Sequence, residues 1–169
     1  MPPNFIETFL YMAFELMTPR GIILQGKVVL NCFSPEGEFE VPQPLGLNPR
    51  VESLSGKKIA LFWDGKPGGD NFFAALNELL KERYPDTTIF LVAWNDVEES
   101  NRVKQFIDTF VFGVGDNGYG GYYTALQTIS LEKEGKPGVG LITDNCIHTA
   151  KISAEVNGMP NLRIVNILH

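Results

Sequence analysis

The first residues that could take part in chemistry lie in a short loop after an apolar stretch. Asp64-Gly65-Lys66-Pro67 directly follows residues 58–63 (KIALFW). Lys66 carries the only fixed positive charge in the loops that we expect to follow strands, so it is the best candidate for pairing with a substrate carboxylate or phosphate. We therefore count Lys66 among the catalytic candidates and Asp64 among the substrate-binding ones. The alternative for Asp64 is an ordinary turn residue.

A second group of candidates lies in residues 113–124, GVGDNGYGGYYT, where five of the twelve residues are glycine. Glycine lets backbone N–H groups approach a ligand, and the N-terminus of a following helix attracts anions. Asp116 and Asn117 are the catalytic candidates of this segment, which contains no cysteine, serine, histidine or lysine. Tight packing of the turn, with tyrosines covering the sheet edge or a partner chain, is the alternative. The candidate substrate-binding residues are Gly118, Tyr119, Gly120, Tyr122 and Tyr123.

A third group follows the apolar residues 138–143. Cys146 would lie at the start of a helix, where the thiol pKa is often lowered, and is a candidate nucleophile. His148 is a candidate acid or base, and Asp144 a candidate substrate contact. Two observations favour a simpler interpretation: a lone cysteine is usually a packing residue, and side chains two positions apart on a helix do not face each other.

These loops are brought together if the chain from residue 57 onward alternates between strands and helices. Near-continuous apolar strands alternating with helices indicate a parallel sheet covered on both faces, that is, a doubly wound α/β domain of the Rossmann or flavodoxin-like class. Such domains bind ligands beyond the C-terminal ends of their strands. We predict strands at 58–63, 88–94, 109–114, 138–143 and 162–168, and helices at 72–84, 97–107, 122–134 and 146–156.

Residues 1–50 have a different pattern and are predicted to form an N-terminal arm, with the α/β domain at 51–169. Residues 4–17 (NFIETFLYMAFELM) fit an amphipathic helix that Asn4 caps and that ends before Pro19. Short apolar runs separated by glycine and proline then suggest a small β-meander between residues 21 and 49. The wide apolar face of the helix packs either on its own domain or on another subunit, as a homo-oligomer or a hetero-oligomer.

Composition narrows the possible partners. The chain has 169 residues, of which 44% are hydrophobic, and a net charge of −6, which argues against nucleic-acid binding. We expect no membrane span, because Glu7 and Glu15 interrupt the most apolar stretch, and we expect a cytoplasmic location. The scattered cysteines and histidines suggest no metal site, and no flavin or nicotinamide fingerprint is present, so we predict no cofactor.

The order of several short motifs resembles that of the UGSC-like family, which is named for a Sec-Gly-Ser-Cys or Cys-Gly-Ser-Cys motif. Members typically show a strand ending in Asn-Gly-Lys-Pro, followed later by Gly-Val-Gly-Asp and the redox motif. They then show a helix ending in Leu-Glu and a Gly-x-Pro before the next strand. The corresponding segments here are Asp64-Gly65-Lys66-Pro67, Gly113-Val114-Gly115-Asp116, Leu131-Glu132 and Gly135-Lys136-Pro137, and the resemblance runs from about Pro44 to the end.

The chain departs from the family at the redox motif itself. Asn117 stands at the position of the selenocysteine or first cysteine, Tyr119 at the serine and Gly120 at the second cysteine. Both redox-active atoms are absent, so the dithiol or selenylsulfide chemistry that the motif implies cannot occur at these positions.

Two main classes of function remain, and we favour the first. One is an enzyme or enzyme subunit with non-redox, cofactor-independent chemistry of the lyase, dehydratase, isomerase or hydrolase type. Its substrate would be a small acidic or carbonyl compound bound at the C-terminal edge of the strands. The other is a degenerate, non-catalytic subunit that pairs with a cysteine-containing homologue. A binding module without catalysis is a third, weaker possibility.

Overall fold

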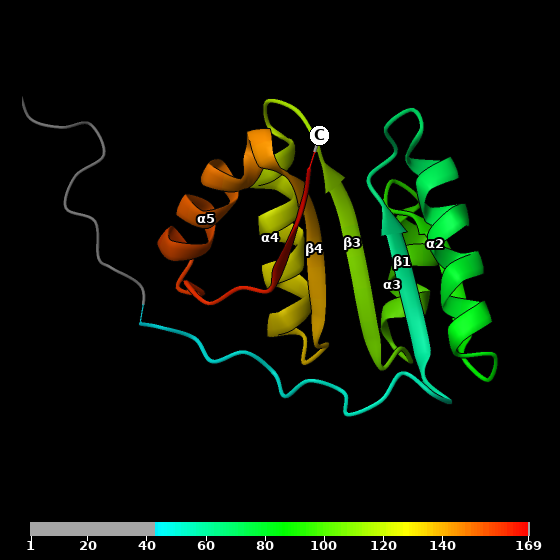
Figure 1. Ribbon diagram of the computed structural model, residues 1–169. Coiled ribbons are helices and arrows are strands. Elements are labelled where there is room, and N and C mark those ends of the chain that lie inside the picture. The colour runs from blue at the N-terminus through cyan, green and yellow to red at the C-terminus, as the bar shows by residue number, and fades with distance from the viewer. Residues whose placement is uncertain (1–42, 169) are drawn as a thin grey trace, which may run out of the picture. The chain divides into compact units, whose positions relative to one another are not determined.

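The computed structural model of the chain describes residues 43–168 (Figure 1). The predicted N-terminal helix and most of the predicted β-meander, up to residue 42, lie outside the described residues. Residues 43–49, the last part of that meander, form neither helix nor strand. Within the described part, none of the helices has the length and apolar character needed to cross a bilayer.

Strands and helices alternate along the described chain, as the sequence predicts. The strands are β1 (Lys58–Trp63), β2 (Thr88–Ala93), β3 (Thr109–Gly115), β4 (Gly138–Thr143) and β5 (Ile164–Ile167). The helices are α2 (Gly69–Arg83), α3 (Val97–Lys104), α4 (Gly120–Lys133) and α5 (Ile147–Val156), with a 3-10 turn, η1 (Asp144–Cys146), before α5.

All five strands are parallel and lie in the order β2-β1-β3-β4-β5. This order confirms the predicted doubly wound α/β fold and is the flavodoxin-like one. The chain passes from β1 to β2 on one side and then returns to place β3 on the other side of β1. The ends of β1 and β3 therefore form the switch point, where ligands bind in folds of this class.

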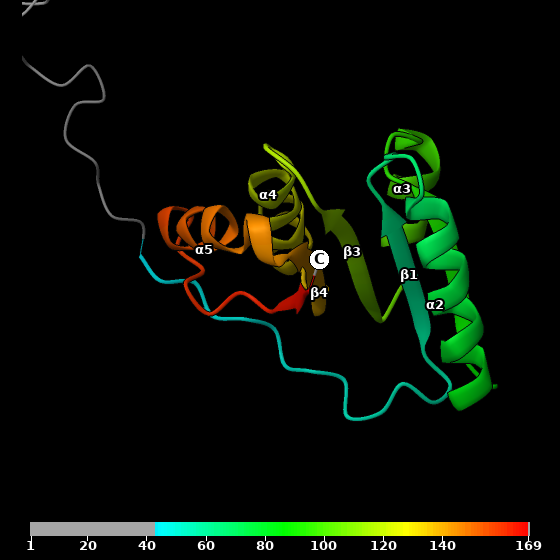
Figure 2. The ribbon, with the colours of Figure 1, turned by 45° about the horizontal axis from the view of Figure 1, so that its top comes forward.

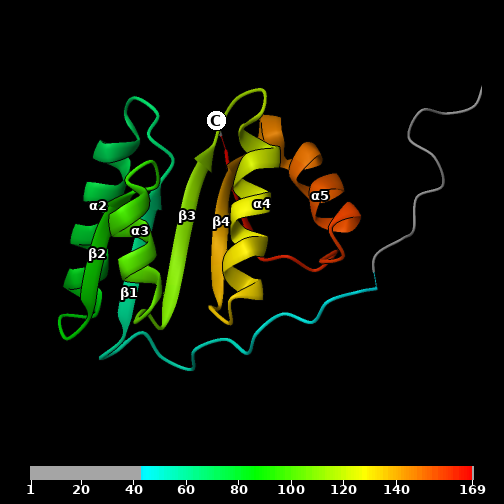
Figure 3. The ribbon, with the colours of Figure 1, turned by 180° about the vertical axis from the view of Figure 1, so that it is seen from behind.

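Helices cover both faces of the sheet. Seen from behind, α3 and α4 lie in front of the strands and α2 lies beyond them (Figure 3). Helices α4 and α5 run side by side on their face (Figure 2). Large buried side chains fill the space between the α3–α4 layer and the sheet, among them Phe62, Phe110, Phe112, Val103 and Leu131.

Several element ends differ from the prediction. Helix α3 stops at Lys104 rather than residue 107, because the chain must turn to pack Phe106 against Phe90, with ring centroids 5.1 Å apart, and to bury Ile107. Helix α4 begins at Gly120, two residues earlier than predicted. Helix α2 begins at Gly69, and its N-cap is Gly68 in the left-handed conformation rather than Asp70 or Asn71. The prediction that Asp96 caps α3 is confirmed, because its carboxylate accepts from the Glu99 N–H at 3.0 Å.

The buried carboxylate of Glu132, near the end of α4, forms hydrogen bonds with three other segments of the chain at the N-terminal edge of the strands. Its Oε1 accepts from Arg163 Nη1 at 2.8 Å and from the Gly138 N–H at 3.1 Å. Its Oε2 accepts from the Asn48 N–H at 3.0 Å and from Asn48 Nδ2 at 2.9 Å. The Glu132 side chain is 0% exposed, so these bonds replace all of its contacts with water. They fix residue 48, from the predicted arm, to the α/β domain.

We expect Glu132→Gln to destabilise the fold strongly. The amide keeps the shape but leaves the Arg163 guanidinium without its counter-charge in a mostly buried position, which costs about 3 kcal/mol of unfolding free energy. Urea unfolding followed by circular dichroism measures this loss. Glu99→Gln is the matched control, because its ion pair with Arg102 lies on the surface, and it should leave the stability unchanged. Equal stability of the two variants would contradict the role of Glu132.

Candidate functional site

The C-terminal ends of β1 and β3 place the two halves of the candidate site next to each other. The strands are hydrogen-bonded neighbours up to the Trp63–Gly113 pair, and the Asp64 N–H then donates to the Gly113 carbonyl at 3.1 Å. The loop after β1 carries Asp64 and Lys66, and the loop after β3 carries Asp116. Sequence positions about fifty residues apart are brought together by this pairing.

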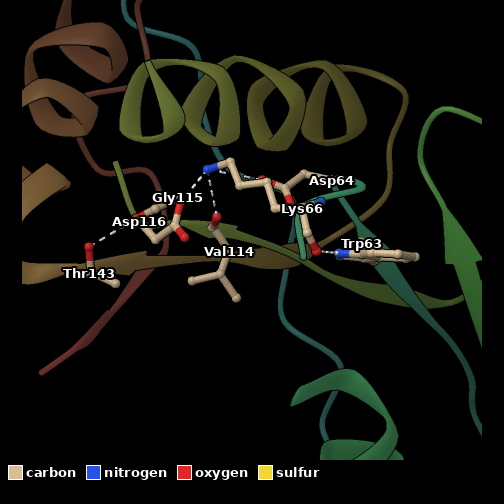
Figure 4. A network of polar contacts seen from close by, with 7 residues as sticks. All are labelled: Trp63, Asp64, Lys66, Val114, Gly115, Asp116 and Thr143. Atoms are coloured by element: carbon tan, nitrogen blue, oxygen red, sulfur yellow. Dashed lines mark hydrogen bonds and ion pairs between the residues drawn. The ribbon is translucent and has the colours of Figure 1, made fainter. Parts of the chain in front are cut away.

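The Lys66 ammonium lies at the centre of the site (Figure 4). It donates to Asp116 Oδ1 in a short hydrogen bond and to the Val114 carbonyl at 3.3 Å. It also forms an ion pair with Asp64 Oδ2 at 3.4 Å, which is too long for a good hydrogen bond. The structure thus brings together three of the residues that the sequence indicates, Asp64, Lys66 and Asp116.

The two carboxylates around Lys66 differ in their exposure. The side chain of Asp64 is 3% exposed, whereas that of Asp116 is 39% exposed. Asp64 Oδ2 is buried and has no hydrogen-bond partner in the structure. One carboxylate is therefore fixed inside the protein, and the other faces the solvent.

Burial and neighbouring charges shift the pKa values of Asp64 and Lys66 in opposite directions. Burial raises the pKa of Asp64 above its ordinary value, despite the opposing charge and hydrogen bonds of Lys66. Burial also opposes the charge on Lys66, but the hydrogen bond to Asp116 and the two nearby carboxylates outweigh it and raise the Lys66 pKa. Lys66 therefore stays a cation at neutral pH, while Asp64 is the carboxyl group of the site that takes up a proton more readily than usual.

Trp63 and Gly69 hold the loop that carries Lys66. The Trp63 indole N–H donates to the Lys66 carbonyl at 2.9 Å, and the Gly69 N–H donates to the same oxygen at 3.2 Å. A Cβ on Gly69 would lie 2.2 Å from Trp63 Nε1, so a larger residue at this position would displace the indole. The backbone between them turns at Gly65 and Gly68, whose φ angles are 89° and 85°.

The glycines after β3 make room for the lysine. A Cβ on Gly120 would lie 2.7 Å from Lys66 Nζ, and a Cβ on Gly115 would lie 2.7 Å from the Gly120 carbonyl oxygen. Two glycines of the segment that the sequence suggests as a ligand cradle, Gly115 and Gly120, thus make room for the Lys66 side chain between β3 and α4.

An open cavity of about 260 Å³ adjoins the ammonium. This volume is below the range of about 300–1,000 Å³ that is usual for ligand pockets, so it suits a small molecule. The cavity has charged groups on one side and apolar surface on the other. Its lining residues are Asp64, Lys66, Pro67, Gly68, Gly69, Phe72, Val114 and Asp116.

The remaining candidates of the glycine-rich segment lie away from this cavity. Asn117, Gly118 and Tyr119 are exposed, and the Tyr119 side chain contacts Tyr122 edge to face at 4.9 Å. Tyr123 instead packs on the sheet beside Phe112, with centroids 6.2 Å apart. Burial raises the pKa of Tyr123 above its ordinary value, so its phenol stays protonated. Their predicted roles in catalysis or binding stay predictions.

The candidates after β4 are not gathered at the site either. Cys146 is buried in the cluster formed by α4, α5 and β4, which includes Ala125, Ile142 and Ala150. His148 and Asp144 are exposed, and no hydrogen bond or ion pair joins either of them to Lys66. The position of Cys146 fits the packing interpretation given above.

Three site residues were not found from the sequence. Trp63 could have been noticed as the last residue of its strand, since such residues border the ligand edge. Thr143 donates to the Gly115 carbonyl at 3.2 Å and so supports the loop that carries Asp116. Thr124 is fully buried, and its hydroxyl has no partner. Neither threonine has a sequence signal, because the contacts depend on how α4 and β4 meet.

A comparison with protein-family models gives a match that covers the whole α/β domain. A model of the UGSC family matches residues 31–169. The chain belongs to the UGSC family. No match was found among curated proteins or among solved structures. The segments that carry the resemblance have distinct places in the structure. Asp64-Gly65-Lys66-Pro67 and Asp116 form the site, and Leu131-Glu132 contains the buried Glu132 carboxylate at the opposite edge of the sheet.

Residues 43–168 contain no group of three or more histidine, cysteine, aspartate or glutamate side chains positioned to hold a metal ion. The charged atoms of the site are instead arranged around an ammonium group.

The raised pKa of Asp64 predicts a specific dependence of stability on pH. The folded chain binds this proton more readily than the unfolded chain, in which the aspartate pKa is about 3.9. The protonation of Asp64 therefore adds to the free energy of unfolding. This addition is fully present below the unfolded-state pKa and is lost as the pH rises through the folded-state pKa. The free energy of unfolding of the wild type minus that of Asp64→Asn should therefore increase from about pH 7 to about pH 4.

Urea unfolding at a series of pH values measures this difference. Asp144→Asn is the control, because its side chain is exposed and makes no ion pair in the described structure. A difference for Asp64→Asn that stays constant or decreases as the pH is lowered would show that burial does not govern this carboxyl group.

Proposed function

We propose that this UGSC family member is an enzyme that transfers a proton on a small carbonyl-bearing or acidic substrate, without redox chemistry. The observation that carries the proposal is the Lys66 ammonium, held between a buried and an exposed carboxylate beside a small cavity at the switch point. Groups with perturbed pKa values in a cleft at such a point are typical of active sites.

The charges of Lys66 and Asp64 suggest different roles for the two residues in the reaction. Lys66 remains a cation and can stabilise negative charge that develops on a substrate oxygen, as preorganised donors do in enolate and oxyanion sites. Asp64 has a raised pKa and an oxygen without a hydrogen-bond donor, which suits a group that accepts and returns a proton. Trp63 and Gly69 keep the loop in place, so neither group needs to reorganise during the reaction.

The reaction classes that fit are those in which a proton leaves a carbon next to a carbonyl or carboxyl group. Lyases, dehydratases and isomerases of the cofactor-independent kind proceed in this way, with a cation near the developing enolate. The sulfur-based chemistry of the family motif is not needed for such a step, in agreement with Asn117 and Gly120 at the motif positions.

Proton transfer can be tested before the full reaction is known. We expect the protein to accelerate hydrogen–deuterium exchange next to the carbonyl group of at least one member of a panel of small 2-oxo acids and ketones. The exchange is followed by proton NMR in D2O. Lys66→Ala and Asp64→Asn should each lower the rate by about 100-fold or more, because each removes one of the two groups that act on the proton or the enolate.

Matched controls separate this effect from changes in charge or stability. Lys81→Ala and Asp86→Asn remove exposed groups on α2 and in the following loop, and should retain the wild-type rate. Exchange that is absent for the whole panel, or that persists in both site variants, would contradict the proposal.

A non-catalytic subunit is the second candidate, and the replacement of both redox-active residues of the family motif favours it. In that case the chain would form a stable complex with a homologue that keeps both cysteines, and isolated chains would show no exchange. Native mass spectrometry of the protein purified from its source distinguishes such a hetero-oligomer from a homo-oligomer or a monomer.

A further inference from the structure

The Lys66 ammonium has three N–H groups and is surrounded by three oxygens. Asp116 Oδ1 and the Val114 carbonyl accept hydrogen bonds from it, and Asp64 Oδ2 forms the ion pair at 3.4 Å. A substrate anion can therefore lie against the ammonium only if one of these oxygens moves away. Which oxygen can move decides what kind of substrate group the site admits.

Asp116 is the acceptor that is free to leave. Val114 contributes a backbone carbonyl of β3, and the Asp64 side chain is 3% exposed. Asp116 is 39% exposed and follows the last residue of β3. Among the described residues its carboxylate makes no hydrogen bond other than the one to Lys66. Rotation of its side chain into solvent breaks one partly exposed ion pair, which costs less than moving the buried Asp64 carboxylate.

The net charge of the site favours a ligand carboxylate that replaces the Asp116 carboxylate over one that binds beside it. Two carboxylates and one ammonium give the site a net charge of −1. A third carboxylate beside them would add repulsion in a partly buried site, where such interactions are much stronger than in water. If an incoming carboxylate takes the place of Asp116, the balance around Lys66 does not change.

The cavity next to Asp116 is suited to the rest of such a ligand. Gly68 and Gly69 start the fifteen-residue helix α2, whose N-cap has no side-chain hydrogen bond, and a helix N-terminus attracts a carboxylate. Phe72, Pro67 and Val114 provide an apolar wall for a short hydrocarbon part. Asp64 also lines the cavity and its buried Oδ2 accepts no hydrogen bond, so the polar groups of the site are not all paired within the described chain.

We propose that the Asp116 carboxylate occupies the position of a substrate carboxylate, and that a small monocarboxylate with a short apolar tail displaces it from Lys66. This inference names the substrate class of the proposed active site and rests on it for its catalytic meaning. The binding itself does not depend on any reaction and can be tested separately.

The test uses the full chain with Asp116→Ala and titrates it with acetate and propionate. Without its internal carboxylate, the variant should bind these probes saturably and at least tenfold more tightly than the wild type, where Asp116 competes. Binding is measured by NMR shifts of the amides of residues 64–69 and by the rise in melting temperature. Chloride at equal ionic strength and propylammonium should have no such effect.

Matched variants identify the site. Glu99→Ala also removes a carboxylate from an ion pair and should gain no binding, because Arg102 is exposed and does not line the cavity beside Lys66. The double variant Lys66→Ala/Asp116→Ala should lose the binding that Asp116→Ala gains.

Other outcomes would overturn the inference. These are no saturable binding to Asp116→Ala, equal binding to the double variant, or equal gains in Glu99→Ala. If Asp116→Ala does not fold, Asp116→Asn serves instead, because its neutral amide cannot replace the anion. Proton exchange on ketones alone, without carboxylate binding, would refute the substrate class and leave the proposed function standing. Carboxylate binding without hydrogen–deuterium exchange would support the substrate class and contradict the proposed function.

Discussion

The ammonium group of Lys66 links the ends of the two central strands, and much of the local structure follows from the space and charge that it needs. Gly120 lacks the Cβ that would come within 2.7 Å of Nζ. Gly115 allows α4 to approach closely enough to leave that space. Asp64 and Asp116 supply the negative charge that makes an ammonium tolerable in a partly buried position. Gly115 and Gly120 of the glycine-rich segment are thus explained by the lysine from the loop after β1.

Stability and the candidate chemistry are located at opposite edges of the sheet. The buried Glu132 binds Asn48, Gly138 and Arg163 at the N-terminal edge, where it orders the segment before β1 and the start of β4. The Lys66 site lies at the C-terminal edge and contains a buried oxygen without a partner. This separation is expected of parallel α/β domains, in which unsatisfied groups at the ligand edge are compensated by packing elsewhere.

Much of the fold could be predicted from the sequence, because buried parallel strands are continuous apolar runs and β1, β2, β3 and β4 start at the predicted residues. The helix ends were less predictable. Gly120 and Gly121 start α4 against their low helix propensity, because Lys66 and the Cys146 backbone leave no room for a Cβ at these positions. At the site, Lys66 and the two aspartates follow from strand-end placement, which also applies to Trp63, whereas Thr124 and Thr143 depend on tertiary contacts that no local pattern encodes.

The central claim is that Lys66 is a permanently charged group held by Asp64 and Asp116, and the titration of its side chain by NMR tests this most directly. With carbon-13 labelling at Cε, the account predicts a Lys66 pKa above that of an ordinary lysine, and a clear decrease when Asp116 is replaced by alanine. A Lys66 pKa at or below the ordinary value, unchanged by that substitution, would contradict the account.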